Sequence, residues 1–517
     1  MGKYILNRLL HGVFSIIILM AIVMTLIFSL LDRNSIFVSD SLFNTKKSNA
    51  KIVYKYEQWE KYGYLDYIDY TEYISKQVND GIISEELGFS AQALGKTPNH
   101  DNNIVKEWTN KFINYYEEND YKIIRLNYEN VGDKVSGKQR LFAYKNISLV
   151  KRLLDYFSNI IEIDSLSYAK EVKGERKISF TFFDEAYGGK RFSPAIMGNG
   201  TKHKYLLYID NSFPFIHQNF ININLGKSFV GENKGKDIVN VLTDKQGKDV
   251  YNYTYFPSGA IEYRAEDIHS LEYQYGASKL YPNLYIDDYV ATKLNKDSFS
   301  RIGNSFLIGI IASILTYIIG VPIAMLMAKN KNKLIDKIGT IYIIFILAVP
   351  SLAYIFMFRA LGDSLFNLPT SFNLPNQNKI LIFVLPIISL ALPAMANIMK
   401  WLRRYMIDQM NSEYVRFAKS SGLDDKKIFI KYIFKNASIP LIHGIPGTIL
   451  GSLTGAIITE SVYSVPGTGG LLTDAIGIYD NGSIIALTFL YGILTIVSVI
   501  LGDALIKIID PRIAYED

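Results

Sequence analysis

The apolar residues of this chain gather into long runs that are separated by polar segments. One run, Gly12–Leu31, has 20 residues and no charge. Five more follow residue 300, at about 304–328, 338–361, 380–399, 439–461 and 483–506. A helix that rises about 1.5 Å per residue needs roughly 20 apolar residues to cross a bilayer. The pattern therefore predicts six transmembrane helices, of which the first is too long for the core of a cleaved signal peptide.

Lysine and arginine in short loops indicate which side of the membrane is cytoplasmic. The loop after the second run contains four lysines between 329 and 337, and the loop after the fourth contains nine basic residues between 400 and 435. The loops near 362–378 and 462–482 contain none. We therefore expect a multi-pass protein of the cell membrane, with both termini in the cytoplasm and residues 33–300 outside.

The polar segment 33–300 is too long and too rich in aromatic residues for an unstructured loop. Apolar residues at helical spacing begin at Ile104 and again at Leu149, and Ile178–Phe182 alternates like a strand. A hairpin is expected where 238–242 and 250–256 flank a turn. These patterns predict an extracellular α+β domain, which either helps another protein to dock or passively supports the helices.

Composition and motifs argue against catalysis by this chain. It has no cysteine, which excludes disulfides and thiolate chemistry, and its six histidines lie far apart without the spacing of metal ligands. The segment Gly95–Thr97 lacks the first glycine of a phosphate-binding loop. We expect no enzymatic activity, no metal site and no cofactor bound by this chain.

Two charged residues lie at the ends of predicted spans and are candidates for the transport pathway or its gating. Arg359 ends the third span and Glu460 ends the fifth, both near the outer face. Ionisable groups at membrane depth are costly and are commonly functional. The two side chains either pair with each other or reach the interface separately.

The cytoplasmic segment 411–440 contains a break between two predicted helices. Gly422 suits the positive φ of a C-terminal cap, and Asp424 with Asp425 suits the start of the next helix. Such a hinged pair would present Ala418, Gly422 and Leu423 as a close-fitting docking surface. A basic loop held by anionic lipid is the alternative.

At these residues the chain resembles the B-type (OppB/DppB-like) permease subunits of peptide/nickel ATP-binding-cassette (ABC) importers. The family pattern Glu-Tyr-Val-Arg-x-Ala-x-x-x-Gly-Leu, then Asn-Ala and a proline, is present between Glu413 and Pro440. Glu460–Gly469, with Pro466 and Gly467, and Ile509–Ile513 are similar to two further family blocks, and Leu225–Phe229 is weakly similar to a third. The outer segment is much longer than in typical members and resembles the enlarged permeases of streptococci and related Gram-positive bacteria.

The resemblance implies a type I ABC importer permease fold with three parts. These are an N-terminal segment with the first helix (1–32), the extracellular domain (33–300) inserted between helices 1 and 2, and a permease core (301–517) whose coupling loop covers 400–438. The residues that it implies for contact with an ATPase are Glu413, Ala418, Gly422, Leu423, Asp424 and Ile428. Those that it offers for the pathway or gating are Arg359, Glu460, Pro466 and Gly467.

The implied partners are a second, C-type permease, two cytoplasmic ATPases and an extracellular lipid-anchored peptide-binding protein, in a lipid bilayer and without nucleic acid. ATP and Mg would be bound by the ATPases alone. The implied function is import of oligopeptides through a heterodimeric pathway, with nickel, haem or another small solute as alternative cargo. Two other classes are a secondary transporter, which would need a coupling-ion site, and a membrane sensor, which would need a cytoplasmic output domain.

Overall fold

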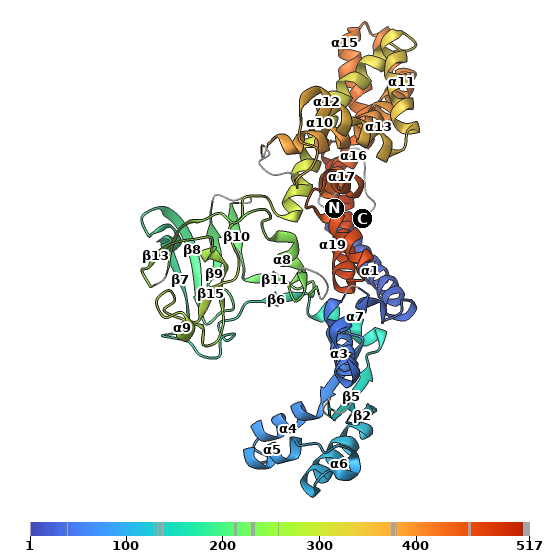
Figure 1. The fold of residues 1–517 in the computed structure, drawn as a ribbon. Coiled ribbons are helices and arrows are strands. Elements are labelled where there is room, and N and C mark those ends of the chain that lie inside the picture. The colour runs from blue at the N-terminus through green and yellow to red at the C-terminus, as the bar shows by residue number, and fades with distance from the viewer. Residues whose placement is uncertain are drawn as a thin grey trace.

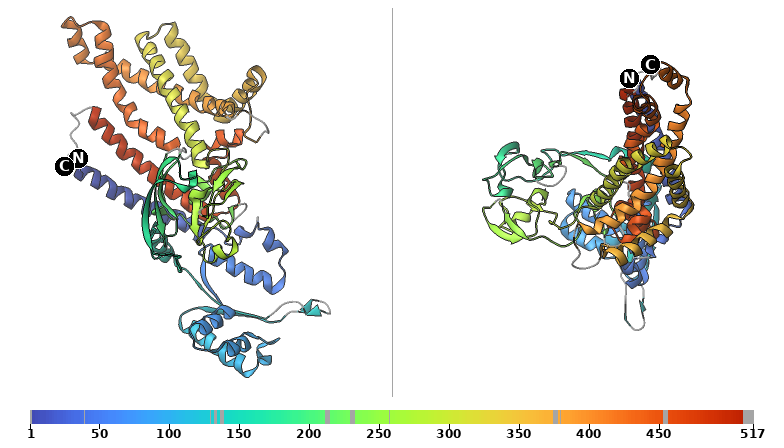
Figure 2. Two further views of the ribbon diagram at one scale, coloured as in Figure 1. Left: turned by 90° about the vertical axis from the view of Figure 1, so that its left-hand side faces the viewer. Right: turned by 90° about the horizontal axis from the view of Figure 1, so that it is seen from above.

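The computed structural model describes residues 2–38, 40–128, 130–131, 134–135, 139–210, 215–228, 233–256, 258–373, 378, 380–452 and 456–509. Within these residues, long helices form a bundle with two mixed lobes, one below the bundle and one beside it in the view of Figure 1. The start of α1 and the last turns of α19 lie side by side (Figure 2), where the Tyr4 hydroxyl donates to Asp503.

In the part of the chain that the structure describes, four helices are long and apolar enough to cross a membrane. Each matches one of the apolar runs in the sequence. They are α1 (Gly2–Thr25) with its π-helical continuation Leu26–Leu30, α10 (Arg301–Lys329), α13 (Val384–Met410) with the preceding turn Leu381–Phe383, and α19 (Asn481–Ile509).

The apolar run 338–361 does not form one continuous helix. The chain forms two helices there, α11 (Leu334–Ala348) and α12 (Ser351–Phe366), which are bent by 110° relative to each other. The bend falls at Pro350, whose ring removes a backbone donor and disfavours helical geometry in the preceding residue. Val349 accordingly has an extended backbone, with φ −82° and ψ 132°. Counted as one crossing, this bent pair raises the number of candidate spans to five.

The expected span 439–461 is divided between two helices. A continuous helical stretch runs through α15 (Asp425–Ile428), a π-helical segment (Phe429–Phe434) and α16 (Lys435–Gly451). The separate helix α17 (Ile457–Tyr463) then leads to α18 (Thr468–Gly477). At 17 residues, α16 is shorter than the four long helices and is not among the candidate spans.

The long helices pack through small residues. Gly320 of α10 lies against Met395 of α13, and the Thr316 hydroxyl donates to the Ala391 carbonyl, so these two helices run parallel. An added Cβ at Gly12 of α1 would lie 2.6 Å from Ile496 of α19. These close approaches are what small side chains permit between membrane helices.

The first lobe contains a three-stranded antiparallel sheet in the order β1-β5-β2, covered by helices. Its elements are α2 (Ser41–Thr45), α3 (Ser48–Lys61), β1 (Leu65–Asp69), α4 (Tyr70–Asn79), α5 (Glu85–Gln92), α6 (Asn103–Glu118), β2 (Lys122–Leu126), β3 (Asn130–Val131), β4 (Lys134–Val135) and β5 (Arg140–Asn146).

The second lobe contains a four-stranded antiparallel sheet in the order β10-β9-β8-β7 and two separate two-stranded sheets. Its elements are β7 (Lys177–Phe183), β8 (Phe192–Asn199), β9 (Tyr205–Ile209), β10 (Ile216–Gln218), β12 (Asn252–Tyr255), β13 (Ile261–Arg264), β14 (Leu271–Tyr273), α9 (Ala277–Leu280) and β15 (Tyr289–Ala291). Three elements lie between the lobes and the bundle: α7 (Leu149–Ser158), the ribbon β6 (Ile161–Ile163) with β11 (Ile221–Ile223), and α8 (Ile238–Thr243).

The helices expected from Ile104 and Leu149 and the strand expected at 178–182 are confirmed as α6, α7 and β7. The expected hairpin between 238–242 and 250–256 is wrong. Residues 238–243 form α8 instead, and β12 pairs with β13. Ile238, Val241 and Leu242 have helical spacing, and all three are buried in a cluster with Met20 of α1 and Phe489 of α19. Burial against the long helices therefore outweighs the local hairpin signal.

Candidate functional site

The break at Gly422 is confirmed. Helix α14 (Glu413–Ser420) ends just before Gly422, which has φ +74°, and the Asp424 carboxylate caps α15 by accepting from the backbone N–H groups of Lys426 and Lys427. A Cβ at Gly422 would meet no atom within 4 Å, so the glycine is needed for its backbone conformation and not for lack of space. The two helices therefore form a fixed elbow, which we call the α14–α15 elbow (residues 413–428).

The elbow has an inner and an outer face. Glu413, Arg416, Phe417 and Ser420 of α14 are exposed, as are Gly422 and Asp424. Phe417 is the one large apolar side chain among them and is 75% exposed. Phe417 is therefore the main apolar group that this face can offer to a partner.

Ala418 does not lie on the docking surface that the sequence suggested. It is buried together with Val415 and Ile428, while Leu423 is half-buried against the same cluster. Val415 and Ala418 are three residues apart and so share one side of α14. The small residue at 418 therefore permits close packing inside the molecule.

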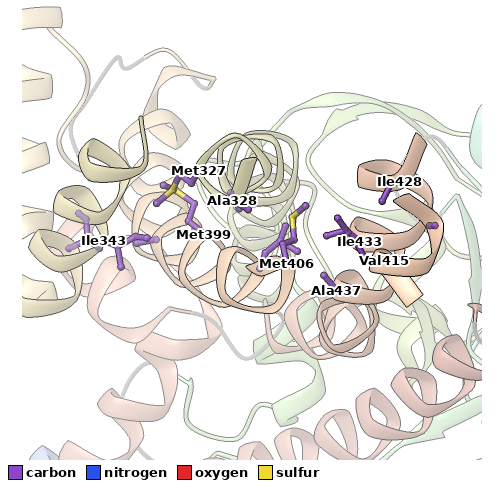
Figure 3. Packing of buried hydrophobic residues seen from close by; sticks show 14 residues of the cluster. Met327, Ala328, Ile343, Met399, Met406, Val415, Ile428, Ile433 and Ala437 are labelled. Carbon is purple, nitrogen blue, oxygen red and sulfur yellow. The ribbon is translucent and has the colours of Figure 1, made fainter. Parts of the chain in front are cut away.

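The inner face joins the elbow to the long helices. Val415, Ala418 and Ile428 lie in one buried cluster with Leu402 and Met406 of α13. The same cluster continues to Ala324, Met327 and Ala328 of α10, to Ile343 and Ile346 of α11, to Ile433 of the π-helical segment and to Ala437 of α16 (Figure 3). Close-packed side chains transmit displacement because they leave little free volume. A force on the outer face would therefore reach several helices at once.

An ion pair adds to this connection. Arg403 of α13 makes two hydrogen bonds to the carboxylate of Asp336 at the start of α11, and the bond from Nη2 to Oδ2 is 2.7 Å long. The Asp336 carboxylate also accepts from the backbone N–H of Asn332. Asp336 is buried. The pair therefore fixes α11 to α13 beside the elbow.

At the other end of the bundle from the elbow, the starts of α10 and α18 meet α17 at a buried polar cluster around Glu460. The Glu460 carboxylate accepts from the Ser305 hydroxyl at 2.8 Å, from the Ala456 N–H at 3.1 Å and from the Gly470 N–H at 3.0 Å. Ser305 in turn accepts from the N–H of Thr468. Ser305, Glu460 and Thr468 are all buried. We call Ser305, Glu460 and Thr468 the Glu460 cluster.

The other three pathway candidates surround this cluster in different ways. Gly467 packs so closely that an added Cβ would lie 2.3 Å from Glu460 Oε2, and the Pro466 carbonyl accepts from the Asn304 amide. Arg359 of α12 donates to the Val462 carbonyl at 2.9 Å. Arg359 and Glu460 thus bond to different groups and do not pair with each other. Glu460 is buried inside the protein, so its side chain does not reach the membrane–water interface.

Several residues at these sites gave no signal in the sequence. Ser305 and Asp336 carry no motif, and their importance comes from partners that are 155 and 67 positions away. Phe417 is part of the family pattern only as an unspecified position. The C-terminal block that begins at Asp510 lies outside the described residues.

These features define a multi-helix membrane protein with a packed elbow at one end of its long helices. Residues 320–515 match the family of the inner membrane component of binding-protein-dependent transport systems. Over 99% of its length, the chain is 32% identical to the oligopeptide transport system permease protein AmiC of Streptococcus pneumoniae, of which it covers 98%. The chain therefore belongs to the family of binding-protein-dependent transport permeases.

Two shorter relatives match about half of the chain. The dipeptide transport system permease protein DppB of Lactococcus lactis is 28% identical over 47% of this chain and 77% of its own length. The oligopeptide transport system permease protein AppB of Bacillus subtilis is 29% identical over 43% of this chain and 73% of its own length. A solved structure of the MetNI methionine ABC transporter covers 41% of this chain and 94% of its own, at 12% identity and a TM-score of 0.32.

Proposed function

We propose that this chain is the permease subunit of an ATP-driven oligopeptide importer and forms half of the translocation pathway. The full-length similarity to an oligopeptide permease, which includes the enlarged segment between the first two long helices, supports oligopeptides over nickel, haem or other small solutes. The chain would act with a second permease, two ATPases that bind ATP and Mg, and an extracellular lipid-anchored peptide-binding protein.

The observation that carries the mechanism is the two-faced packing of the elbow. Its outer face presents Phe417, Gly422 and Asp424, and its inner face is buried against α10, α11, α13 and α16. Seated on an ATPase, the elbow would move with that subunit when ATP binds. The buried cluster would then carry the movement to the spans as a rigid-body motion between two states.

We propose that the chain crosses the membrane six times. Besides the four long helices and the bent α11–α12 pair, the helical stretch 425–451 is long enough, at about 1.5 Å per residue, to extend across a bilayer. Its α16 part packs along α19, where the Gly447 position faces Ser498 and Gly502 lies against His443. The elbow lies at the end of the bundle where α10 and α13 end, and where Tyr4 of α1 donates to Asp503 of α19. The basic loops support a cytoplasmic location for this end and an extracellular location for residues 33–300.

The Glu460 cluster would lie at the extracellular end of the pathway and hold the starts of α10 and α18 against α17. We propose that it positions these helix ends during gating. Its groups are hydrogen-bonded to one another, which supports a positioning role over direct binding of cargo.

The substitution Gly422→Asp tests the coupling role. It places a charge on the outer face and strains a backbone with φ +74°, so we expect peptide uptake and stimulation of the ATPase to be lost while membrane insertion is retained. Gly63 is the matched control, because it has φ +72°, equal free space, and a location in the first lobe. If Gly422→Asp transports peptide as well as Gly63→Asp does, the elbow does not couple ATP hydrolysis to transport.

A further inference from the structure

The ribbon β6–β11, between the second lobe and the bundle, has one entirely aliphatic face. Its register pairs Ile221 with Ile163 and Ile223 with Ile161, so these four isoleucines share a face. Asn222 and Glu162 pair on the other face, where the Asn224 amide also donates to Glu162. All four isoleucines are 43–74% exposed. We call them the isoleucine face.

The base of the ribbon is anchored to the long helices. Ile160 precedes β6 and Leu225 follows β11 by two residues, and both are buried in one cluster with Met20 and Met24 of α1 and with Ile485 of α19. The backbone N–H of Asn224 donates to the Ile160 carbonyl and closes the ribbon at this point. The ribbon therefore starts directly from the surface of the bundle.

The helix that leads into the ribbon contacts the same two long helices. Tyr156 and Phe157 of α7 pack against Phe489 of α19, with ring centroids 5.8 and 6.2 Å apart. The Arg152 guanidinium lies 4.1 Å from the centre of the Phe28 ring. Val150 and Leu154, one turn apart on α7, are 67% and 65% exposed. Thus α7 carries apolar side chains on its outer surface as well as against the bundle.

These contacts indicate the depth of the ribbon. Met24 and Phe28 lie within the charge-free run Gly12–Leu31, and Met24 is about 10 Å before its end at 1.5 Å per residue. Phe489 likewise lies inside the apolar run of α19, eight residues after its start at Asn481. The elements α7 and β6–β11 are therefore attached below the outer ends of the spans and not beyond them.

We propose that the isoleucine face, with Val150 and Leu154 of α7, lies on the outer leaflet of the lipid bilayer. Along the same stretch, α1 and its π-helical continuation also expose aliphatic side chains, among them Ile22, Leu26 and Leu30. A bilayer that covers α1 would therefore continue onto these elements. This inference requires that α1 and α19 span the membrane, and it does not depend on the transport of peptides.

The chemistry of this face favours lipid over a protein partner. It contains aliphatic side chains alone, whereas the energetic centres of protein interfaces are rich in Trp, Tyr and Arg. A two-stranded ribbon also has free backbone edges, which hydrocarbon cannot satisfy. The ribbon therefore lies in the headgroup layer of the membrane, with its isoleucines directed toward the acyl chains. Monotopic elements bury an apolar face about 5–10 Å deep in this layer.

Because the chain has no cysteine, single cysteines can report on each face of the ribbon. The variants Ile163→Cys and Ile223→Cys probe the isoleucine face, and Asn222→Cys is the matched control on the other face. Each variant is labelled with an environment-sensitive fluorophore and assembled into the complete transporter. The cysteines of the partner subunits are replaced beforehand. The labelled transporter is then placed in nanodiscs of phosphatidylcholine and phosphatidylglycerol. One quencher is attached to the lipid acyl chains near the headgroup, and the other is aqueous iodide.

We expect acyl-chain quenchers to reduce emission strongly at 163 and 223, and iodide to reduce it at 222. Emission at 163 and 223 should also be shifted to shorter wavelength relative to 222. Iodide quenching at 163 and 223 equal to that at 222 would overturn the inference, because the face would then lie in water. Protection of 163 and 223 from both quenchers would overturn it as well, because a protein would then cover the face.

Discussion

The hydroxyl of Ser305, in the first turn of α10, donates a hydrogen bond of 2.8 Å to the Glu460 carboxylate of α17. The two residues are 155 positions apart, and neither is more than 3% exposed. Glu460 also accepts from the backbone N–H groups of Ala456 and Gly470. Hydrogen bonds to a carboxylate are stronger than those between neutral groups. One side chain therefore connects three segments that lie apart in the sequence.

The first prediction concerns this carboxylate. In Glu460→Ala, the buried hydroxyl of Ser305 and the half-buried N–H groups of Ala456 and Gly470 lose their acceptor. A buried group that is left unsatisfied costs about 1–3 kcal/mol, and a half-buried one costs less because water can reach it. We expect a clear drop in the melting temperature of the purified protein in detergent and loss of transport. Glu460→Gln keeps one acceptor oxygen, so its melting temperature should lie between that of Glu460→Ala and that of the parent. The exposed Glu413→Ala is the control for stability, and equal melting of all three variants would contradict the role of the cluster.

The second prediction concerns the glycine beside the carboxylate. An added Cβ at Gly467 would lie 2.3 Å from Glu460 Oε2 and 2.7 Å from Ser305 Oγ, so Gly467→Ala must displace both. Overpacking of this kind typically costs about 1–3 kcal/mol. Three residues on, Gly470 has nothing within 4 Å of an added Cβ and lies in the helix α18. Gly470→Ala should therefore be neutral in thermal melting, and similar melting of both variants would argue against steric contact at 467.

The third prediction concerns the ion pair between Arg403 and Asp336. Removal of one partner leaves a buried charge without compensation, which costs about 3–5 kcal/mol for a fully buried pair. Because Arg403 is partly exposed, we expect Arg403→Ala to lower the free energy of unfolding by somewhat less than this. Arg403→Lys should recover only part of the loss, since an ammonium cannot make the same two parallel bonds. Thermal melting measures the loss of stability, and Arg404→Ala, at an exposed neighbouring position, is the control. Equal melting temperatures of Arg403→Ala and Arg404→Ala would contradict a stabilising role for the ion pair.

The fourth prediction concerns pH and the second lobe. Asp184 is buried and accepts from His269 Nε2 at 2.7 Å and from the Tyr205 hydroxyl at 2.7 Å. Burial by itself would raise the pKa of Asp184, but the hydrogen bond and charge of His269, with bonds from Ala186 and Tyr205, hold this pKa below its usual range. The ionised carboxylate therefore stabilises the folded lobe above about pH 4, the unfolded value for Asp, and this contribution is lost as the pH falls through the lowered pKa.

Asp184→Asn tests this linkage. Hydrogen exchange in β8 and β9 should be faster in the variant than in the parent at pH 7, and the difference should shrink as the pH falls below about 4. The control is Glu185→Gln, an exposed carboxyl in the adjacent turn, which should behave like the parent at every pH. A constant difference between Asp184→Asn and the parent across the whole range would show that the carboxylate does not titrate with folding.

The parts of the fold that could be predicted from the sequence are those governed by local rules. The apolar runs indicated the four long helices, and Gly422 with Asp424 indicated the break between α14 and α15, because length, positive φ and helix capping depend on neighbouring residues. The bend at Pro350 was also visible locally, but membrane helices often tolerate proline. Its effect here depended on packing that the sequence does not display.

The remaining features depend on contacts between distant segments. Residues 238–242 fold as a helix because the surface of α1 and α19 buries Ile238, Val241 and Leu242. Ala418 belongs to the family pattern, which suggested a surface role, but its side of α14 faces α13. In the same way, the sequence singled out Glu460 as a charged residue at the end of a span and could not show that Ser305 would be its partner.

The last prediction concerns Phe417 on the outer face of the elbow. A 75% exposed aromatic ring contributes little to folding, so Phe417→Ala should change the melting temperature of the isolated chain very little. If the ring fills a pocket of the ATPase, its removal should cost at least about 2 kcal/mol of binding, which corresponds to roughly 30-fold weaker association. Association of the ATPase with the permease in nanodiscs measures this directly. The matched control is Phe366→Ala, a 70% exposed phenylalanine at the end of α12. Equal ATPase affinity of the two variants would exclude Phe417 as a contact residue, whereas weaker association of Phe417→Ala alone would place this ring in the interface.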